Sequence, residues 1–332
     1  MTSRSTASTV TAAPARRDRL DWKLLVATLA VAALLVVSLF TGVYSLDGHG
    51  AGSPDMFWIT RVPRTLALVL AGAAMAICGL VMQLLTQNRF VEPTTTGTTE
   101  WAGLGLLAVM IFFPGASLLG RMVGAIIAAF IGTAIFFAFL RRVSMRSSLI
   151  VPIVGIMLGS VVSAVSTFFA LQTNMLQQLG VWFAGSFATI LRGQYEVLWI
   201  VAIVLVAVFV LADRLTVAGL GSEIATNVGL NYNRIMLVGT SLVAIATGVV
   251  TVVVGNLPFL GLIVPNIVSM FRGDNLRSNL PWVCLLGIAT VTVCDILGRT
   301  IIMPFEVPVS LVLGVIGSIA FVLLLLRKRR YG

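Results

Sequence analysis

Long apolar runs fill this chain from about residue 24 to residue 326, and short polar or basic segments separate them. About 20 apolar residues are enough for a helix to cross the ~30 Å hydrocarbon layer of a membrane, so each long run predicts a membrane-spanning helix. Ten spans can be drawn, at residues 24–45, 65–86, 101–114, 119–140, 149–171, 195–212, 235–254, 259–271, 281–297 and 307–326. The pattern therefore predicts an all-α, polytopic membrane protein with about ten transmembrane helices.

Two of these spans, at 101–114 and 259–271, are short and contain or adjoin Gly and Pro. Membrane helices tolerate such breaks where the freed backbone is buried in protein or lines a cavity. The semi-apolar stretch 172–193 predicts a further short helix or re-entrant segment outside the spans. We therefore expect irregular backbone inside the helical bundle.

The composition leaves no room for a separate soluble domain. Hydrophobic residues make up 58% of the chain and charged residues only 10%, whereas soluble domains carry about 25% charged residues. Residues 1–22 are polar and predict a disordered cytoplasmic tail, and residues 23–332 predict one transmembrane domain. The first apolar run lacks an evident small-residue cleavage site, so we expect an uncleaved first span rather than a signal peptide.

The basic residues indicate the topology. An even number of spans puts both ends of the chain on one side, and the basic segment 327–330 places that side in the cytoplasm by the positive-inside rule. All but five of the 22 basic residues then lie on the cytoplasmic side, the exceptions being Arg61, Arg64, Arg121, Arg192 and Arg299. The net charge of +10 is thus spread along short loops, and it does not form the basic face of a nucleic-acid-binding protein.

Enzymatic chemistry has little support in the sequence. The two lysines, Lys23 and Lys328, do not follow a glycine-rich phosphate-binding loop, so the chain does not hydrolyse ATP by that route. The single histidine, His49, provides no metal cluster, and no G-x-S-x-G nucleophile motif is present. We therefore expect no catalytic, cofactor-binding or metal-binding residues, and a membrane enzyme is the weakest alternative.

An ion-coupled secondary transporter is a second alternative, and it would use ionisable groups within the membrane. The acidic residues nearest the spans, Glu100, Glu196, Asp295 and Glu306, all lie near span ends, which weakens this alternative. Glu100 is expected in the first turn of the third span, where the helix dipole favours an acid. Asp295 precedes Arg299 by four residues and is expected to pair with it on one helix face.

Two polar features interrupt the apolar pattern. The loop between the sixth and seventh spans, about residues 213–234, contains a short predicted helix followed by Gly229, which suits a contact with a soluble motor subunit; an ordinary amphipathic linker is the alternative. In the fifth span Ser160, Ser163 and Thr167 recur at helical spacing and predict a hydroxyl stripe facing a translocation path. Such hydroxyls also bond their own backbone, and this alternative stays open.

Several segments, in order, resemble the family of iron-chelate and cobalamin permeases of ATP-binding-cassette (ABC) importers. They read RVPR (61–64), NRFVEP (88–93), WFAGS (182–186), E-x-A-x-x-x-G (223–229), FLGLIVPN (259–266) and DILGR (295–299). The resemblance runs from about residue 55 to the end of the chain, and it is nearest to the ferric siderophore branch. It implies the fold of a type II ABC importer permease.

The resemblance also implies contacts with partner proteins. Arg61, Arg64 and Arg299 occupy the places of arginines that dock acidic residues of an external substrate-binding protein; snorkelling to lipid headgroups is the alternative. A separate ATPase would contact the coupling loop through Leu220, Glu223, Ala225, Gly229 and Leu230. The cytoplasmic gate would comprise Asn88, Phe90, Ser147 and Ser148. Here Arg89 and Phe90 replace the family's usual Pro and Leu.

The implied assembly lies in a bacterial plasma membrane, with both termini cytoplasmic. It comprises a second permease, with a heterodimer favoured over a homodimer, two ATPase subunits that use ATP, and the binding protein that delivers a ferric siderophore. This chain itself would bind no cofactor and no nucleic acid. A haem or cobalamin permease of the same family is the nearest alternative.

Overall fold

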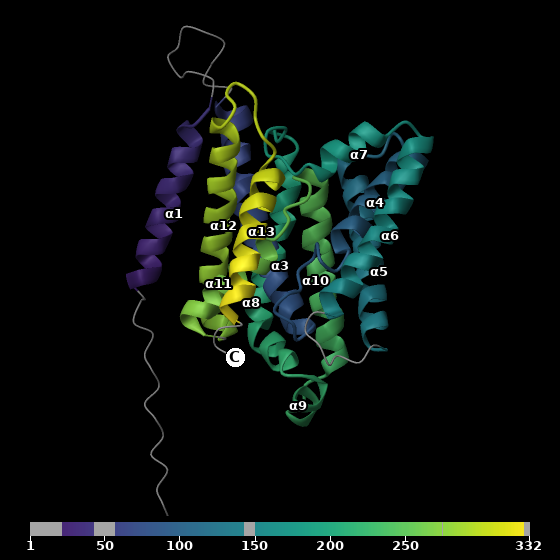
Figure 1. Cartoon of the computed structure of the whole chain (residues 1–332), viewed down its shortest axis with the longest axis vertical. Helices are drawn as coiled ribbons and strands as arrows, with labels where there is room; N and C mark the ends of the chain where they lie inside the picture. Colours follow the sequence, from purple (N-terminus) through teal and green to yellow (C-terminus); the bar gives the residue numbers. More distant parts are fainter. Residues whose placement is uncertain (1–21, 43–56, 143–149, 274, 329–332) are drawn as a thin grey trace, which may run out of the picture.

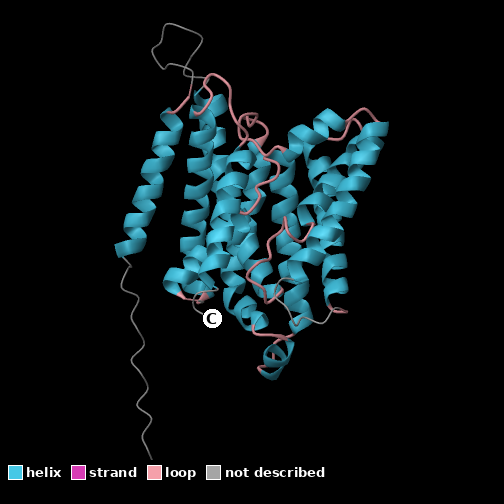
Figure 2. Ribbon diagram, in the orientation of Figure 1, coloured by secondary structure: helices cyan, strands magenta, loops and turns pink. Residues whose placement is uncertain are grey.

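The computed structural model describes residues 22–42, 57–142, 150–273 and 275–328. Within these ranges every regular element is a helix and no strand occurs, which confirms the predicted all-α class (Figure 2). The seven long apolar helices, two of them preceded by a short π- or 3-10-helical turn, are α1 (Trp22–Phe40), η1–α3 (Phe57–Arg61, Val62–Leu85), α5 (Leu118–Leu140), α6 (Ile150–Gln172), η2–α8 (Tyr195–Leu198, Trp199–Gly219), α10 (Tyr232–Val253) and α12 (Leu276–Thr300).

Five further helices complete the described part of the chain. Three are apolar, namely α4 (Thr98–Phe112), α11 (Leu260–Arg272) and α13 (Val309–Lys328), and together with the seven long helices they account for all ten predicted spans. The other two are α7 (Leu176–Phe183), which lies in the stretch predicted as a short helix, and α9 (Ser222–Asn227), which lies in the predicted coupling loop. In Figure 1, α9 protrudes at one end of the bundle and the α12–α13 connection lies at the opposite end.

The centre of the bundle is α3, which contacts α8, α10, α11 and α12. Its sequence is rich in Ala and Gly, and small residues let membrane helices approach closely without a hydrophobic driving force. Gly79 lies against Gly261 of α11, and Gly72 lies against Gly287 of α12. By contrast α1 is peripheral and contacts α12 and α3 (Figure 1). Only 6% of its apolar 18-residue stretch is buried.

Two of the helices begin inside the bundle after irregular segments. At a 1.5 Å rise per residue, the 15 residues of α4 and the 13 of α11 are about 22 and 20 Å long, too short to cross ~30 Å of hydrocarbon. The buried carboxylate of Glu92 connects the two segments, since its Oε1 accepts hydrogen bonds from the Phe259 N–H (2.9 Å) and the Thr94 hydroxyl (2.5 Å). The irregular backbone predicted beside the third and eighth spans is therefore buried in protein, as membrane depth demands.

Candidate functional site

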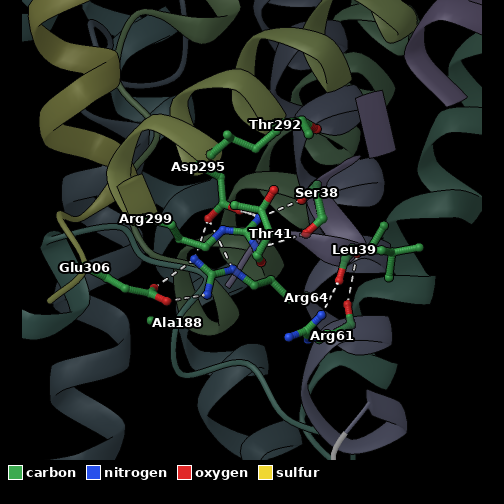
Figure 3. Close-up of polar contacts among 12 residues, drawn as sticks. Ser38, Leu39, Thr41, Arg61, Arg64, Ala188, Thr292, Asp295, Arg299 and Glu306 are labelled. Carbon is green, nitrogen blue, oxygen red and sulfur yellow. Dashed lines mark hydrogen bonds and ion pairs between the residues drawn. The ribbon is translucent and has the colours of Figure 1, made fainter. Parts of the chain in front are cut away.

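Four charged side chains form a cluster (Figure 3) beside the α12–α13 connection, which lies at the end of the bundle opposite α9 (Figure 1). Arg64 lies in the first turn of α3, Asp295 and Arg299 lie one turn apart on α12, and Glu306 lies between α12 and α13. Asp295 Oδ1 accepts hydrogen bonds from Arg64 Nε (3.2 Å) and Nη2 (2.7 Å), and Asp295 Oδ2 pairs with Arg299 Nη2. The predicted Asp295–Arg299 pair is therefore confirmed.

Arginine side chains also satisfy the last carbonyl groups of α1. Arg299 Nη1 donates to the backbone oxygens of Ser38 (3.0 Å) and Thr41 (2.7 Å), and its Nη2 donates to the Ser38 hydroxyl (2.5 Å). Arg61 Nη1 donates to the Leu39 oxygen at 2.9 Å. The final carbonyls of a helix lack intrahelical partners and carry partial negative charge, so these guanidinium groups stabilise the α1 end.

The structure brings the three predicted docking arginines to one end of the bundle, where they line a cleft of about 510 Å³. Their accessibility differs. Arg299 is only 6% exposed, and both of its terminal nitrogens are bonded within the chain. The partly exposed Glu306 also lines the cleft and holds Arg64. Sequence reasoning gave Glu306 no role, because its arginine partner lies 242 residues away in the chain.

At the α9 end, the predicted coupling loop forms a short helix with a defined stop. The Leu230 N–H donates to the Ala225 oxygen and the Gly229 N–H to the Thr226 oxygen, both at 2.9 Å, which is the Schellman pattern of a helix C-terminus. Gly229 has a φ of +80°, the left-handed value that this position needs. The glycine therefore terminates the helix, and the space around it is open.

The five predicted coupling residues divide into two groups. Leu220, Glu223 and Gly229 are exposed, whereas Ala225 is fully buried and Leu230 packs partly against the core. Ala225 and Leu230 thus fix α9 to its own bundle. Two further apolar residues of this loop, Ile224 (48% exposed) and Val228 (65%), were not predicted as coupling residues, although their apolar character in a polar segment was a signal.

Half of the predicted gate can be located. Asn88 is buried, and its Oδ1 accepts a hydrogen bond from the Phe90 N–H at 2.9 Å. The Phe90 ring packs edge-to-face on Phe321 of α13, with centroids 6.0 Å apart. Asn266 of α11 donates to the Arg89 oxygen at 2.8 Å, so this segment is held by two helices. The other predicted gate residues, Ser147 and Ser148, lie outside the described residues.

The predicted hydroxyl stripe lies on one face of α6 and lines a cleft of about 700 Å³. The Ser160 and Thr167 hydroxyls also donate to the oxygens of Ile156 and Ser163, both at 2.8 Å, so these two line the cleft and bond their own backbone as well. Glu100, in the first turn of α4 as predicted, lines the same cleft, and its buried Oε2 has no hydrogen-bond partner. The cleft thus combines hydroxyls with one carboxylate.

Ten apolar helices in the described part of the chain, with inner breaks and an exposed short helix at one end, are typical of a membrane transport permease. The chain belongs to the FecCD transport family, whose model matches residues 23–327. The family predicted by the resemblance is therefore confirmed. The chain is a permease subunit of an ABC importer, a transport component rather than an enzyme.

Three comparisons illustrate the relationship. The petrobactin import system permease protein FatD of Bacillus anthracis is 62% identical, over 92% of this chain and 91% of that protein. The petrobactin permease YclN of Bacillus subtilis is 41% identical, over 90% and 96%. A solved metal-chelate type ABC transporter in an inward-facing conformation superposes with a TM-score of 0.79 at 26% identity, over 92% of this chain and 99% of that one.

Proposed function

We propose that this permease imports a ferric siderophore of the petrobactin class. The 62% identity to a petrobactin permease, over nearly the whole of both chains, carries this proposal. Vitamin B12 permeases are more distant, for example 31% identical for the Escherichia coli protein, which makes cobalamin the second candidate. Parallel uptake assays with ferric petrobactin, cobalamin and haem distinguish the candidates.

In the proposed assembly this chain pairs with a second permease, preferably a different one, and two ATPase subunits bind on the α9 side. That side is cytoplasmic, as are both termini, and the membrane is the bacterial inner membrane. The exposed Leu220, Ile224 and Val228 support an apolar contact with the ATPase, beside Glu223. The capped helix α9 would transmit ATP-driven motion to α8 and α10, which it contacts.

The external substrate-binding protein would dock at the opposite end, over the cleft that Arg61, Arg64 and Arg299 line. Of Arg64 and Arg299, Arg64 has the better support for a direct contact with a partner carboxylate, since its side chain is 14% exposed and that of Arg299 only 6%. The siderophore would then pass the α6 face that carries Ser160, Ser163 and Thr167, and Asn88 and Phe90 would close the path on the cytoplasmic side.

Uptake into proteoliposomes tests the proposal. The vesicles hold this chain with its partner permease and ATPase, ferric petrobactin is supplied on its binding protein, and Gly229→Arg is compared with wild type. We expect uptake to need ATP. We also expect uptake to fall about tenfold or more in Gly229→Arg, because a large side chain at the ATPase contact weakens the coupling between the two proteins. A loss of about 1.4 kcal/mol in coupling free energy corresponds to a tenfold change.

Gly193→Arg is the matched control. Gly193 also has a positive φ (+94°) and open space around it, but it lies away from α9, in the connection between α7 and η2. Its variant should keep most of the uptake. Uptake that persists without ATP and collapses with the ion gradient would instead establish the secondary transporter.

A further inference from the structure

The guanidinium group of Arg64 is shared between two carboxylates that lie in very different surroundings (Figure 3). On one side it donates to Asp295, whose side chain is fully buried. On the other side its Nη1 donates to Glu306 Oε1 at 3.0 Å and its Nη2 to Glu306 Oε2 at 2.9 Å. This second contact is the two-pronged arrangement in which arginine binds a carboxylate with both geometric specificity and strength.

The two carboxylates differ in how readily they can leave Arg64. Asp295 also pairs with Arg299, so its displacement would leave Arg299 without a carboxylate in a buried site, whereas Arg64 would keep Glu306. The Glu306 side chain is 33% exposed, and residues 301–306 around it are all exposed. Water can solvate Glu306 as it leaves, because its side chain is partly exposed, whereas the Asp295 side chain is fully buried. Glu306 is thus the replaceable partner.

The position of Glu306 also controls the charge that an approaching protein meets. The four clustered side chains sum to zero, since Arg64 and Arg299 contribute +2 and Asp295 and Glu306 contribute −2. When Glu306 leaves Arg64, one face of that guanidinium opens toward the cleft that also contains Arg61. The cleft then offers a carboxylate the same two donors that Glu306 occupied.

We infer that Glu306 is a tethered competitor for the carboxylate by which the substrate-binding protein docks. The partner's Asp or Glu binds Arg64 only by replacing Glu306, so docking is an exchange of one carboxylate for another. The exchange weakens docking and makes it reversible, which suits a binding protein that must leave after delivery. This inference rests on the proposed docking role of Arg64.

Affinity measurements on the assembled transporter in nanodiscs test the exchange. The probe is fluorescently labelled binding protein loaded with ferric petrobactin, and the variants are Glu306→Gln, Arg64→Ala and the double variant. We expect Glu306→Gln to lower the Kd about tenfold, because a neutral amide competes poorly for a guanidinium group. Arg64→Ala should raise the Kd, and Glu306→Gln should have no further effect in the Arg64→Ala background.

Glu196→Gln is the matched control, since Glu196 is exposed, follows α7 and accepts a hydrogen bond from the Gly193 N–H rather than from an arginine. An equal gain in affinity in this control would assign the effect to general charge and overturn the inference. An unchanged or higher Kd in Glu306→Gln would overturn it as well. A normal Kd in Arg64→Ala would instead overturn the docking role itself, so the two failures are distinguishable.

Thermal unfolding of each variant identifies any that is misfolded. Where Arg64→Ala does not fold, Arg64→Lys replaces it, because an ammonium group keeps the charge beside Asp295 but lacks the planar fork that holds Glu306. In that background Glu306→Gln should lower the Kd by less than it does beside Arg64.

Discussion

Replacing Asp295 with asparagine is expected to lower the free energy of unfolding by about 3–5 kcal/mol, the usual cost of removing one partner from a buried ion pair. Asp295 is 1% exposed and is the carboxylate that Arg64 and Arg299 share. Its loss leaves Arg299 buried without a counter-charge, while Glu306 reaches only Arg64. The measurement is unfolding of the purified chain in mild detergent by titration with a denaturing detergent.

Asp213→Asn provides the control. Asp213 Oδ2 lies 2.8 Å from Arg277 Nη1, but the two side chains are 70% and 74% exposed, so this substitution should cost less than about 1 kcal/mol. Equal destabilisation by the two substitutions would contradict the view that burial of the Asp295 cluster determines its contribution.

The second large effect concerns the close contact between α3 and α11. Gly79→Ala is expected to cost about 3 kcal/mol, or to prevent accumulation of the folded chain, because overpacked sites are destabilised by roughly this amount. A Cβ atom on Gly79 would lie closer than 3 Å to the backbone of Gly261, so α3 and α11 would have to separate. Yield of monodisperse protein and detergent unfolding measure the effect.

Gly120→Ala is the matched substitution within a membrane helix. A Cβ on Gly120 meets only the Ala116 and Ser117 side chains, at 3.5 and 3.8 Å, which are ordinary contact distances. Because alanine is the better helix former by about 1 kcal/mol, this variant should be neutral or slightly more stable. If Gly79→Ala behaves in the same way, the α3–α11 contact is less tight than the structure shows.

Hydropathy and local signals predicted much of this architecture. Each of the ten predicted spans has its helix, because apolar length is a property of a continuous segment. The Asp295–Arg299 pair was predictable for a similar reason, since residues four apart share a helix face. The position of α9 could be predicted from its glycine and polar residues in an otherwise apolar chain.

Contacts between distant segments could not be predicted in this way. Glu306 binds Arg64 across 242 residues, and Glu92 binds the Phe259 N–H across 167 residues. Neither pair has a local sequence pattern, because the packing of the bundle alone brings the two segments together. The burial of Ala225 could not be predicted either, since a six-residue helix is too short for a hydrophobic period to distinguish its buried face.

The end of α1 has a consequence for biosynthesis. Two of its final carbonyls, those of Ser38 and Thr41, receive their donors from Arg299, a residue 261 positions further along the chain than Ser38. During synthesis α1 enters the membrane first, yet these carbonyls remain hydrated until α12 has been made and inserted. The carbonyls of Ser38 and Thr41 at the end of α1 therefore gain their protein donor only once α12 is in place.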